Sequence, residues 1–303
     1  MTRATASEAA LKFLQDWPVD IDARLRPEDI PALRADISAE FIPRAKRAVA
    51  ATGVEVIEVE IGGIPCLRVV PPAVDVGRRI FYGYGGGFFS GSPFEDLIIS
   101  APLALATRAE VIVPHYRLAP EHPFPAPIDD GFAVYAEMAR SGPFCAVGES
   151  AGGNLVLSVM ARARQAGLAA PEAVALMSPW CDLTSAGDSL TSNDGRDPTL
   201  TKASVDDGAG IYANGVDLGS PELSPLFGDF SAVFPPCIIT SGSRDLLMSQ
   251  SLALASVLRA EGNLADLRIW EGMWHVFEFY DELPEAAASL AEIAAFLSPY
   301  FRD

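Results

Sequence analysis

The chain has 303 residues, of which half are hydrophobic and a fifth are charged, and its 40 acidic and 22 basic residues give a formal net charge of −18. This composition is ordinary for a globular protein that buries a substantial core, and it excludes a largely disordered chain. Because an acidic surface repels phosphate groups, nucleic acid and anionic membrane surfaces are poor partners for it.

Residues 1–48 have the spacing of amphipathic helices, and we expect the prolines in this segment to break them. Charged residues interrupt the apolar residues of the N-terminus, and no later stretch reaches the roughly 18 consecutive apolar residues of a membrane span. We therefore expect a soluble, cytoplasmic protein without a signal peptide. The prolines are Pro18, Pro27, Pro31 and Pro43, and the interrupting charges are Glu8, Lys12 and Asp16.

A hairpin is predicted next, because strand-like runs at 54–60 and 64–70 flank the pair Gly62-Gly63. From there, short apolar runs alternate with stretches of helical spacing. This alternation predicts a doubly wound α/β fold, with a mostly parallel sheet covered on both faces and the hairpin as an antiparallel edge. The further strands are expected at 78–84, 110–116, 143–149, 173–178, 236–242 and 265–270, and the helices at 94–108, 129–140, 151–166, 249–261 and 284–297.

The interval 183–230 is rich in Asp, Ser, Gly and Pro, with one helical patch at 199–213 and no clear strand. Such a length is unusual for a loop in a compact domain. We interpret 183–225 as an insertion that packs with residues 1–48 as a small helical cap, over a catalytic core of 49–182 and 226–303. Apolar cap residues that would close over a site are Phe13, Leu14, Trp17, Ile211 and Tyr212.

The strongest chemical signal is the pentapeptide GESAG, in which Ser150 lies between Gly148 and Gly152. A strand is predicted before it and a helix after it, which is the context of a nucleophile elbow. Glycines are needed on both sides of the serine because a Cβ atom would clash there. Ser150 is therefore the predicted nucleophile.

A nucleophilic serine needs a base and an orienting acid, which follow it along the chain as acid and then histidine. Two of the three histidines precede Ser150, so His275 is the predicted base. Asp245, directly after a predicted strand, fits best as the acid, and Asp266 and Glu271 are the alternatives.

Acyl transfer also needs N–H donors for the developing oxyanion. Gly85-Gly86-Gly87 follows a predicted strand, and the residue after the nucleophile, Ala151, would supply a further N–H. The triplet does not match a dinucleotide-binding loop, because Phe88 stands where the last glycine belongs. The four cysteines (Cys66, Cys145, Cys181 and Cys237) show neither CxxC nor metal spacing, so we expect buried thiols. The sequence has no HExxH motif, no cluster of His and Cys and no phosphate loop, so we expect no metal and no cofactor.

Seven segments together resemble the hormone-sensitive-lipase family of bacterial esterases, and within it the monoterpene ε-lactone hydrolases. This resemblance implies the α/β-hydrolase fold, the triad Ser150, Asp245 and His275, and an oxyanion hole of Gly86, Gly87 and the Ala151 N–H. It also implies a structural rather than catalytic network of Tyr116, Arg117 and Glu121, and a possible homodimer. The segments are YGGGF (84–88), YRLAPEHPFPA (116–126), GESAGGN (148–154), DP (197–198), SPLF (224–227), SGSRDLL (241–247) and EGMWHVF (271–277).

Three residues depart from the family pattern: Tyr84 replaces a usual His, His115 a usual Asp, and Glu149 a common Asp. One hypothesis is that a hydrogen bond between the Tyr84 hydroxyl and His115 supports the glycine loop. The alternative is that Tyr84 only packs under the cap and His115 is unrelated to it.

Aromatic residues flank the predicted site, with plain packing as the alternative for each of them. Phe88, Phe89 and Trp274 are the predicted substrate-pocket residues, and Trp180 and Phe277 lie nearby in sequence.

The predicted function is a serine carboxylic-ester hydrolase that acts on short-to-medium acyl esters or lactones through an acyl-enzyme. One alternative is a non-catalytic receptor for a small ligand on the same fold, like the gibberellin receptors, which lose the catalytic histidine that is present here. The other is an amidase or peptidase that uses the same triad.

Overall fold

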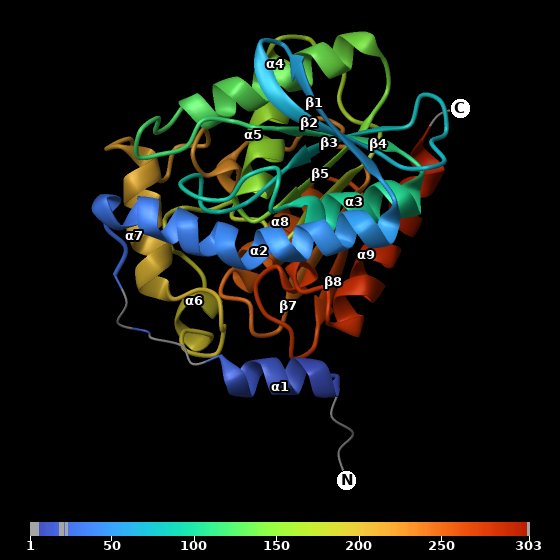
Figure 1. Cartoon of the computed structure of the whole chain (residues 1–303). Coiled ribbons are helices and arrows are strands. Elements are labelled where there is room, and N and C mark those ends of the chain that lie inside the picture. The colour runs from blue at the N-terminus through green and yellow to red at the C-terminus, as the bar shows by residue number, and fades with distance from the viewer. Residues whose placement is uncertain (1–5, 18–20, 22–23, 302–303) are drawn as a thin grey trace.

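The computed structural model describes residues 6–17, 21 and 24–301, and a sheet of eight strands in the order β1-β2-β4-β3-β5-β6-β7-β8 forms its centre (Figure 1). The first hairpin pairs antiparallel with β4, and all remaining neighbours are parallel. The predicted fold class is thereby confirmed. The strands are β1 (Glu55–Ile61), β2 (Ile64–Val70), β3 (Arg79–Gly83), β4 (Glu110–Pro114), β5 (Cys145–Glu149), β6 (Val174–Met177), β7 (Cys237–Gly242) and β8 (Ala265–Trp270).

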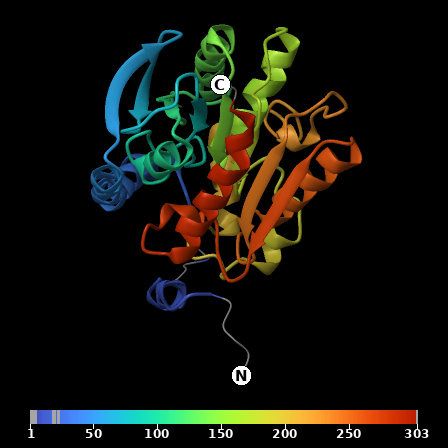
Figure 2. The ribbon, with the colours of Figure 1, turned by 90° about the vertical axis from the view of Figure 1, so that its right-hand side faces the viewer.

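Helices cover both faces of this sheet, as continuous apolar strands require. Helices α4, α5 and α8 pack on one face and α3 and α9 on the other, while α2 packs on α3 (Figures 1 and 2). The helices are α1 (Glu8–Asp16), α2 (Ile30–Thr52), α3 (Leu97–Thr107), α4 (Ala126–Ser141), α5 (Ala151–Gln165), α6 (Ser189–Ser192), α7 (Lys202–Ala213), α8 (Met248–Ala260) and α9 (Pro284–Leu297).

The expectation that prolines break the N-terminal helices is wrong for α2. Pro31 lies in its first turn, where the missing N–H costs no hydrogen bond, and the helix continues through Pro43 to Thr52. Packing of α2 against α3 outweighs the local cost of Pro43. The helix ends at Gly53, whose φ of 67° suits a glycine C-cap. Pro18 lies outside the described residues.

Two apolar clusters are buried in the described part of the chain. The larger contains the sheet and its covering helices. The smaller joins α1 to the segment after β8, with Ala10, Trp274 and Phe277 among its members (Figure 1). The four cysteines are buried free thiols, as expected. Within the described ranges, no helix has both the length and the apolar character to cross a membrane.

Candidate active site

Ser150 lies on the turn between β5 and α5, with φ 51° and ψ −122°, a backbone conformation that L-residues seldom adopt. Close packing around the turn explains its glycines. A Cβ atom on Gly148 would lie 2.4 Å from the carbonyl oxygen of Gly152, and one on Gly152 would lie 2.0 Å from the carbonyl oxygen of Gly83. Only a sequence with glycine at both places can present the serine in this way.

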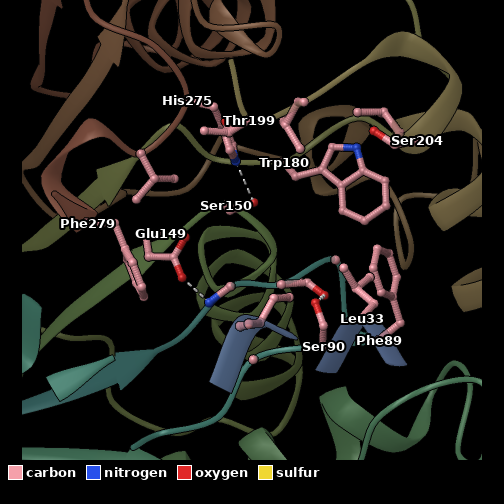
Figure 3. Close-up of a pocket in the computed structure, with 18 of the residues that line it drawn as sticks. Leu33, Phe89, Ser90, Glu149, Ser150, Trp180, Thr199, Ser204, His275 and Phe279 are labelled. Carbon is pink, nitrogen blue, oxygen red and sulfur yellow. Dashed lines mark hydrogen bonds between the residues drawn. The ribbon is translucent and has the colours of Figure 1, made fainter. Parts of the chain in front are cut away.

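The structure brings Ser150, His275 and Asp245 into one hydrogen-bonded line. The Ser150 hydroxyl lies 2.9 Å from Nε2 of His275 (Figure 3), and Nδ1 of that ring lies 3.0 Å from Oδ1 of Asp245. Asp245 follows β7 and His275 follows β8, so adjacent parallel strands bring the two loops together. Of the alternative acids, Asp266 binds Arg268 at 2.8 Å and Glu271 is exposed.

Burial and charge act in opposite directions on this line of residues. Burial alone would lower the pKa of His275, but the charge of Asp245 and their hydrogen bond raise it above its usual value. Burial opposes ionisation of Asp245, but the charge and hydrogen bond of His275, with a 2.7 Å hydrogen bond from Ser241, hold the pKa of Asp245 below its usual value. The aspartate is thus a stable anion that favours protonation of the imidazole.

The loop after β3 forms part of the wall of the cavity beside Ser150. Gly86 and Gly87 line the cavity in front of the serine. Within the described part of the chain, the N–H groups of Gly86, Gly87 and Ala151 donate to no acceptor. The Gly86 φ of 97° and the 2.3 Å that would separate its Cβ from the Ser90 carbonyl oxygen require glycine here. These unpaired donors can serve a developing oxyanion.

The side chain of Glu149, directly before Ser150, binds the loop after β3. Its carboxylate accepts a hydrogen bond from the Gly85 N–H (Figure 3). Burial and the charge of Asp96 raise the pKa of Glu149 above its usual value, and the bond from Gly85 opposes them. The sequence showed Glu149 as a departure from the family pattern but did not indicate this contact.

The proposed support of the loop by Tyr84 and His115 is wrong. The Tyr84 hydroxyl donates to the Tyr116 carbonyl at 3.3 Å, and the Tyr116 hydroxyl donates to the Tyr84 carbonyl at 2.6 Å. The two rings stack with centroids 4.1 Å apart, whereas His115 is exposed and its ring contacts Phe94 edge-on. The Tyr84 hydroxyl therefore bonds to the backbone of Tyr116 and not to the side chain of His115.

The three residues expected to form one structural network bind separate partners. Tyr116 pairs with Tyr84, Arg117 forms an ion pair with Asp130 at 2.7 Å, and Glu121 pairs with Arg34 of α2 at 2.8 Å. Their structural character agrees with expectation, but they do not contact one another as a group.

A cavity of about 390 Å³ opens beside Ser150 and His275. Of the predicted pocket aromatics, Phe89 lines it, and so does Trp180 (Figure 3). Most of the wall is apolar and comes from segments far apart in sequence. Its apolar side chains include Leu25, Leu33, Ile37, Phe41, Phe89, Trp180, Leu200, Val205, Leu247, Val276, Phe279 and Tyr280.

The prediction that Phe88 and Trp274 line the pocket is wrong. Phe88 is fully buried and stacks on Tyr212 with ring centroids 4.2 Å apart. Trp274 is also fully buried and stacks on Phe13 of α1 at 4.5 Å. Successive residues of a turn point in different directions, so sequence proximity to the site could not separate Phe88 from Phe89.

The sequence did not indicate that residues of α2 line the wall of the cavity. Leu33, Ile37 and Phe41 recur every fourth position and therefore share one helix face. That spacing is visible in the sequence, but nothing local indicated that this face covers the cavity. Among the described residues, no group of three or more His, Cys, Asp or Glu side chains is placed to hold a metal ion.

Comparison with known proteins agrees with this geometry. The family model described as alpha/beta hydrolase fold matches residues 80–279. An acetyl-hydrolase of Streptomyces hygroscopicus is 33% identical over 84% of this chain and 86% of its own length. The crystal structure of EstE5 soaked with p-nitrophenyl butyrate has a TM-score of 0.89 at 29% identity and covers 98% of this chain and 99% of that one.

A hormone-sensitive lipase from a metagenome library has a TM-score of 0.89 at 30% identity and covers 99% of this chain and 100% of that one. The resemblance to the hormone-sensitive-lipase family of esterases, inferred from the sequence motifs, is therefore confirmed. The chain belongs to the α/β-hydrolase fold family, among the esterases related to hormone-sensitive lipase.

Proposed function

We propose that this esterase cleaves short-to-medium acyl esters or lactones through an acyl-enzyme on Ser150. The observation that carries the proposal is the unbroken line from the Ser150 hydroxyl through His275 to Asp245 at the wall of the cavity. A serine hydroxyl alone is a weak nucleophile, and it becomes effective when an oriented imidazole accepts its proton.

The reaction follows from the positions of these groups. The Ser150 oxygen attacks the ester carbonyl carbon while Nε2 of His275 takes the hydroxyl proton. The N–H groups of Gly86, Gly87 and Ala151 bind the resulting oxyanion. Collapse of the intermediate expels the alcohol, which receives the proton from His275, and leaves the acyl group on Ser150. Water then attacks the acyl-enzyme with His275 as base, releasing the acid and restoring the serine.

The size and walls of the cavity support a limit on acyl length. We assign Leu33, Ile37 and Phe41 of α2, with Leu200 and Val205 of the insertion, to a cap over the site. A cavity of about 390 Å³ closed on these sides suits acyl groups of roughly C2 to C8. Emulsified long-chain triglyceride requires an open, lipid-facing cleft, so we expect it to be a poor substrate.

A panel of substrates tests the proposal. The panel contains p-nitrophenyl esters from acetate to palmitate, two lactones, and a p-nitroanilide of the best acyl group. We expect the short esters to be cleaved with a burst of one p-nitrophenol per chain, and Ser150→Ala to abolish both burst and turnover. Turnover without a burst that persists in Ser150→Ala would show that the reaction does not pass through an acyl-enzyme on Ser150. Cleavage of the anilide as fast as the ester would favour an amidase. Binding of the esters without turnover would favour a receptor. Homodimer formation and cytoplasmic localisation stay predictions.

A further inference from the structure

Asp197, in the insertion between β6 and β7, is fully buried, and its two carboxylate oxygens bind different parts of the molecule. Oδ1 accepts hydrogen bonds from the Thr199 N–H at 2.9 Å, the Thr199 hydroxyl at 2.8 Å and the Leu200 N–H at 3.3 Å. Oδ2 accepts from the Leu246 N–H at 3.0 Å and from the His275 N–H at 3.3 Å. One side chain therefore joins three segments of the chain.

These segments have distinct places in the site. Thr199 and Leu200 line the cavity, as does His275, the proposed base; Figure 3 labels Thr199 and His275. Leu246 directly follows Asp245. Asn193, four residues earlier, adds to the same connection. Its side-chain amide donates to the carbonyl oxygens of Ser243 at 3.2 Å and Asp245 at 2.9 Å. The insertion thus holds the backbone on both sides of the acid and at the base.

The bonding pattern of Asp197 favours a carboxylate. Four of its five bonds come from backbone N–H groups, which can only donate, and the fifth comes from the Thr199 hydroxyl. Burial and the charge of Asp245 raise the pKa of Asp197, while the charge of His275 and the backbone bonds oppose them. The ionised form fits the donors, so a second negative charge lies beside the imidazole.

Three acidic side chains act on His275 from the elements packed around it. They are Asp245 after β7, Asp197 in the insertion and Glu278 after β8. Glu278 binds the hydroxyls of Thr240 at 2.8 Å and Ser289 at 2.7 Å, and burial raises its pKa. Burial, and after it the charge of Asp197, raise the pKa of the Tyr280 phenol. Asp197 differs from Glu278 because it bonds directly to the backbone of the base.

We propose that Asp197 is a positioning residue, which anchors the His275 and Asp245 loops to the pocket wall and adds negative charge beside the imidazole. This inference rests on the proposed function, because it assigns His275 as the base. It extends that function by making the insertion part of the catalytic geometry as well as a wall of the cavity.

Asp197→Asn is expected to keep the hydrogen bonds that Oδ1 accepts and to lose those that Oδ2 accepts. An asparagine can turn its oxygen toward Thr199 and Leu200, because Asn suits the same local turn, and the cavity wall is then kept. Its NH₂ group then faces the N–H groups of Leu246 and His275 and repels them. We expect kcat to fall by about 10- to 100-fold with KM for p-nitrophenyl butyrate changed much less, since small displacements of catalytic groups have effects of this size.

The pH profile supplies a readout that a merely structural role would not move. Because a nearby negative charge raises the pKa of His275, its removal should lower that pKa. The acidic limb of kcat/KM should therefore move to lower pH in Asp197→Asn. Asp182→Asn is the matched control. Asp182, directly before the insertion, is also buried and accepts from the Thr184 N–H at 2.8 Å and hydroxyl at 2.6 Å, but within the described chain its carboxylate does not bind the Asp245 or His275 loops.

In Asp197→Asn we expect a lowered kcat and an acidic limb of kcat/KM that lies at lower pH than in the wild type. In Asp182→Asn we expect the acidic limb at the same pH as in the wild type. A folded Asp197→Asn protein with wild-type kcat and limb overturns the proposal, as does an equal shift in Asp182→Asn. If Asp197→Asn does not fold, Asp197→Ser, which keeps a turn-forming hydroxyl without the charge, must show the same shift. Failure of both variants to fold overturns the positioning role, because Asp197 is then needed for the fold itself. Activity that survives Ser150→Ala would instead refute the proposed function.

Discussion

Arg34 of α2 is bound to the loop that carries Phe89: its guanidinium donates to the Phe89 carbonyl oxygen at 2.8 Å. The same group donates to the Ala119 carbonyl oxygen at 2.7 Å and pairs with Glu121. A helix from the N-terminal segment is thereby fixed to the loop beside the oxyanion glycines. The cavity wall that α2 provides has a defined position because of these bonds.

Arg34→Met should lower stability and weaken substrate binding. Two partly buried carbonyl groups lose their donor, which costs about 1–3 kcal/mol of unfolding free energy. We expect KM to rise more than kcat falls, because α2 shapes the pocket without contacting the reacting atoms. Urea unfolding and steady-state kinetics measure the two effects. Arg47→Met is the control, since Arg47 is 59% exposed and pairs with Asp281 on the surface. Equal stability of the two variants would contradict the prediction.

Substitutions in the triad should be strongly non-additive. We expect Ser150→Ala and His275→Ala each to reduce kcat by about 10⁵- to 10⁶-fold, with the double variant scarcely worse, because the groups act as a unit. Asp245→Asn should lose somewhat less, about 10⁴-fold. Asp266→Asn is its control, because Asp266 pairs with Arg268 away from the imidazole. Wild-type turnover in Asp245→Asn would move the search for the acid to Asp266 and Glu271.

The wild-type acidic limb should lie above the pKa of an ordinary histidine. His275 must be neutral to accept the serine proton, and its pKa is raised by Asp245 against the effect of burial. Activity should therefore fall as the pH decreases through a value above about 6.5. The pH dependence of kcat/KM for p-nitrophenyl butyrate measures this value. A half-point well below 6.5 in the folded enzyme would show that burial outweighs the charge of Asp245.

Asp96→Asn should stabilise the protein at alkaline pH. Burial raises the pKa of Asp96 to about 8, opposed by its hydrogen bond from Tyr82 and assisted by the charge of Glu95. An unfolded Asp titrates near about 3.9, so the contribution of this group to stability is complete below that pH and is lost as the pH rises to about 8. Asparagine keeps an acceptor for Tyr82 and has no proton to lose.

The advantage of Asp96→Asn over wild type should thus grow between pH 4.5 and pH 8.5, as measured by urea unfolding at each pH. Asp188→Asn is the control, because Asp188 also precedes a helix but is exposed. A constant difference between Asp96→Asn and wild type across this range would show that Asp96 titrates normally.

Leu33→Trp should shorten the acyl chain that the enzyme accepts. Leu33 and Phe89 both line the cavity (Figure 3), and a larger side chain at position 33 fills space that an acyl group would use. We expect kcat/KM for p-nitrophenyl octanoate to fall at least tenfold while that for acetate changes little, since each excluded methylene is worth about 1–3 kcal/mol. Leu252→Trp, at an exposed position of α8, serves as the control. An unchanged chain-length profile in Leu33→Trp would place the acyl group elsewhere.

The order of strands and helices was predictable because each depends on local patterns. Apolar runs and the hairpin glycines predicted all eight strands. The GESAG turn could be recognised because the pentapeptide and the strand and helix on either side of it are contiguous in sequence, although the contact that requires glycine at position 152 is with the distant Gly83 carbonyl oxygen. Chain order also indicated which histidine and which acid belong with Ser150. What sequence patterns could not determine was the direction of side chains whose partners lie elsewhere.

The sequence by itself therefore determined the fold class and the three residues that the structure joins in one line. Only the tertiary structure decided that Phe89 faces the cavity while Phe88 and Trp274 pack away from it, and that Tyr84 binds Tyr116 rather than His115. It also decided that Asp197 reaches the backbone of His275, 78 residues further along the chain. The physical reason is that a local motif carries its own geometry, whereas a pocket wall or a buried carboxylate is defined by donors and surfaces from distant segments.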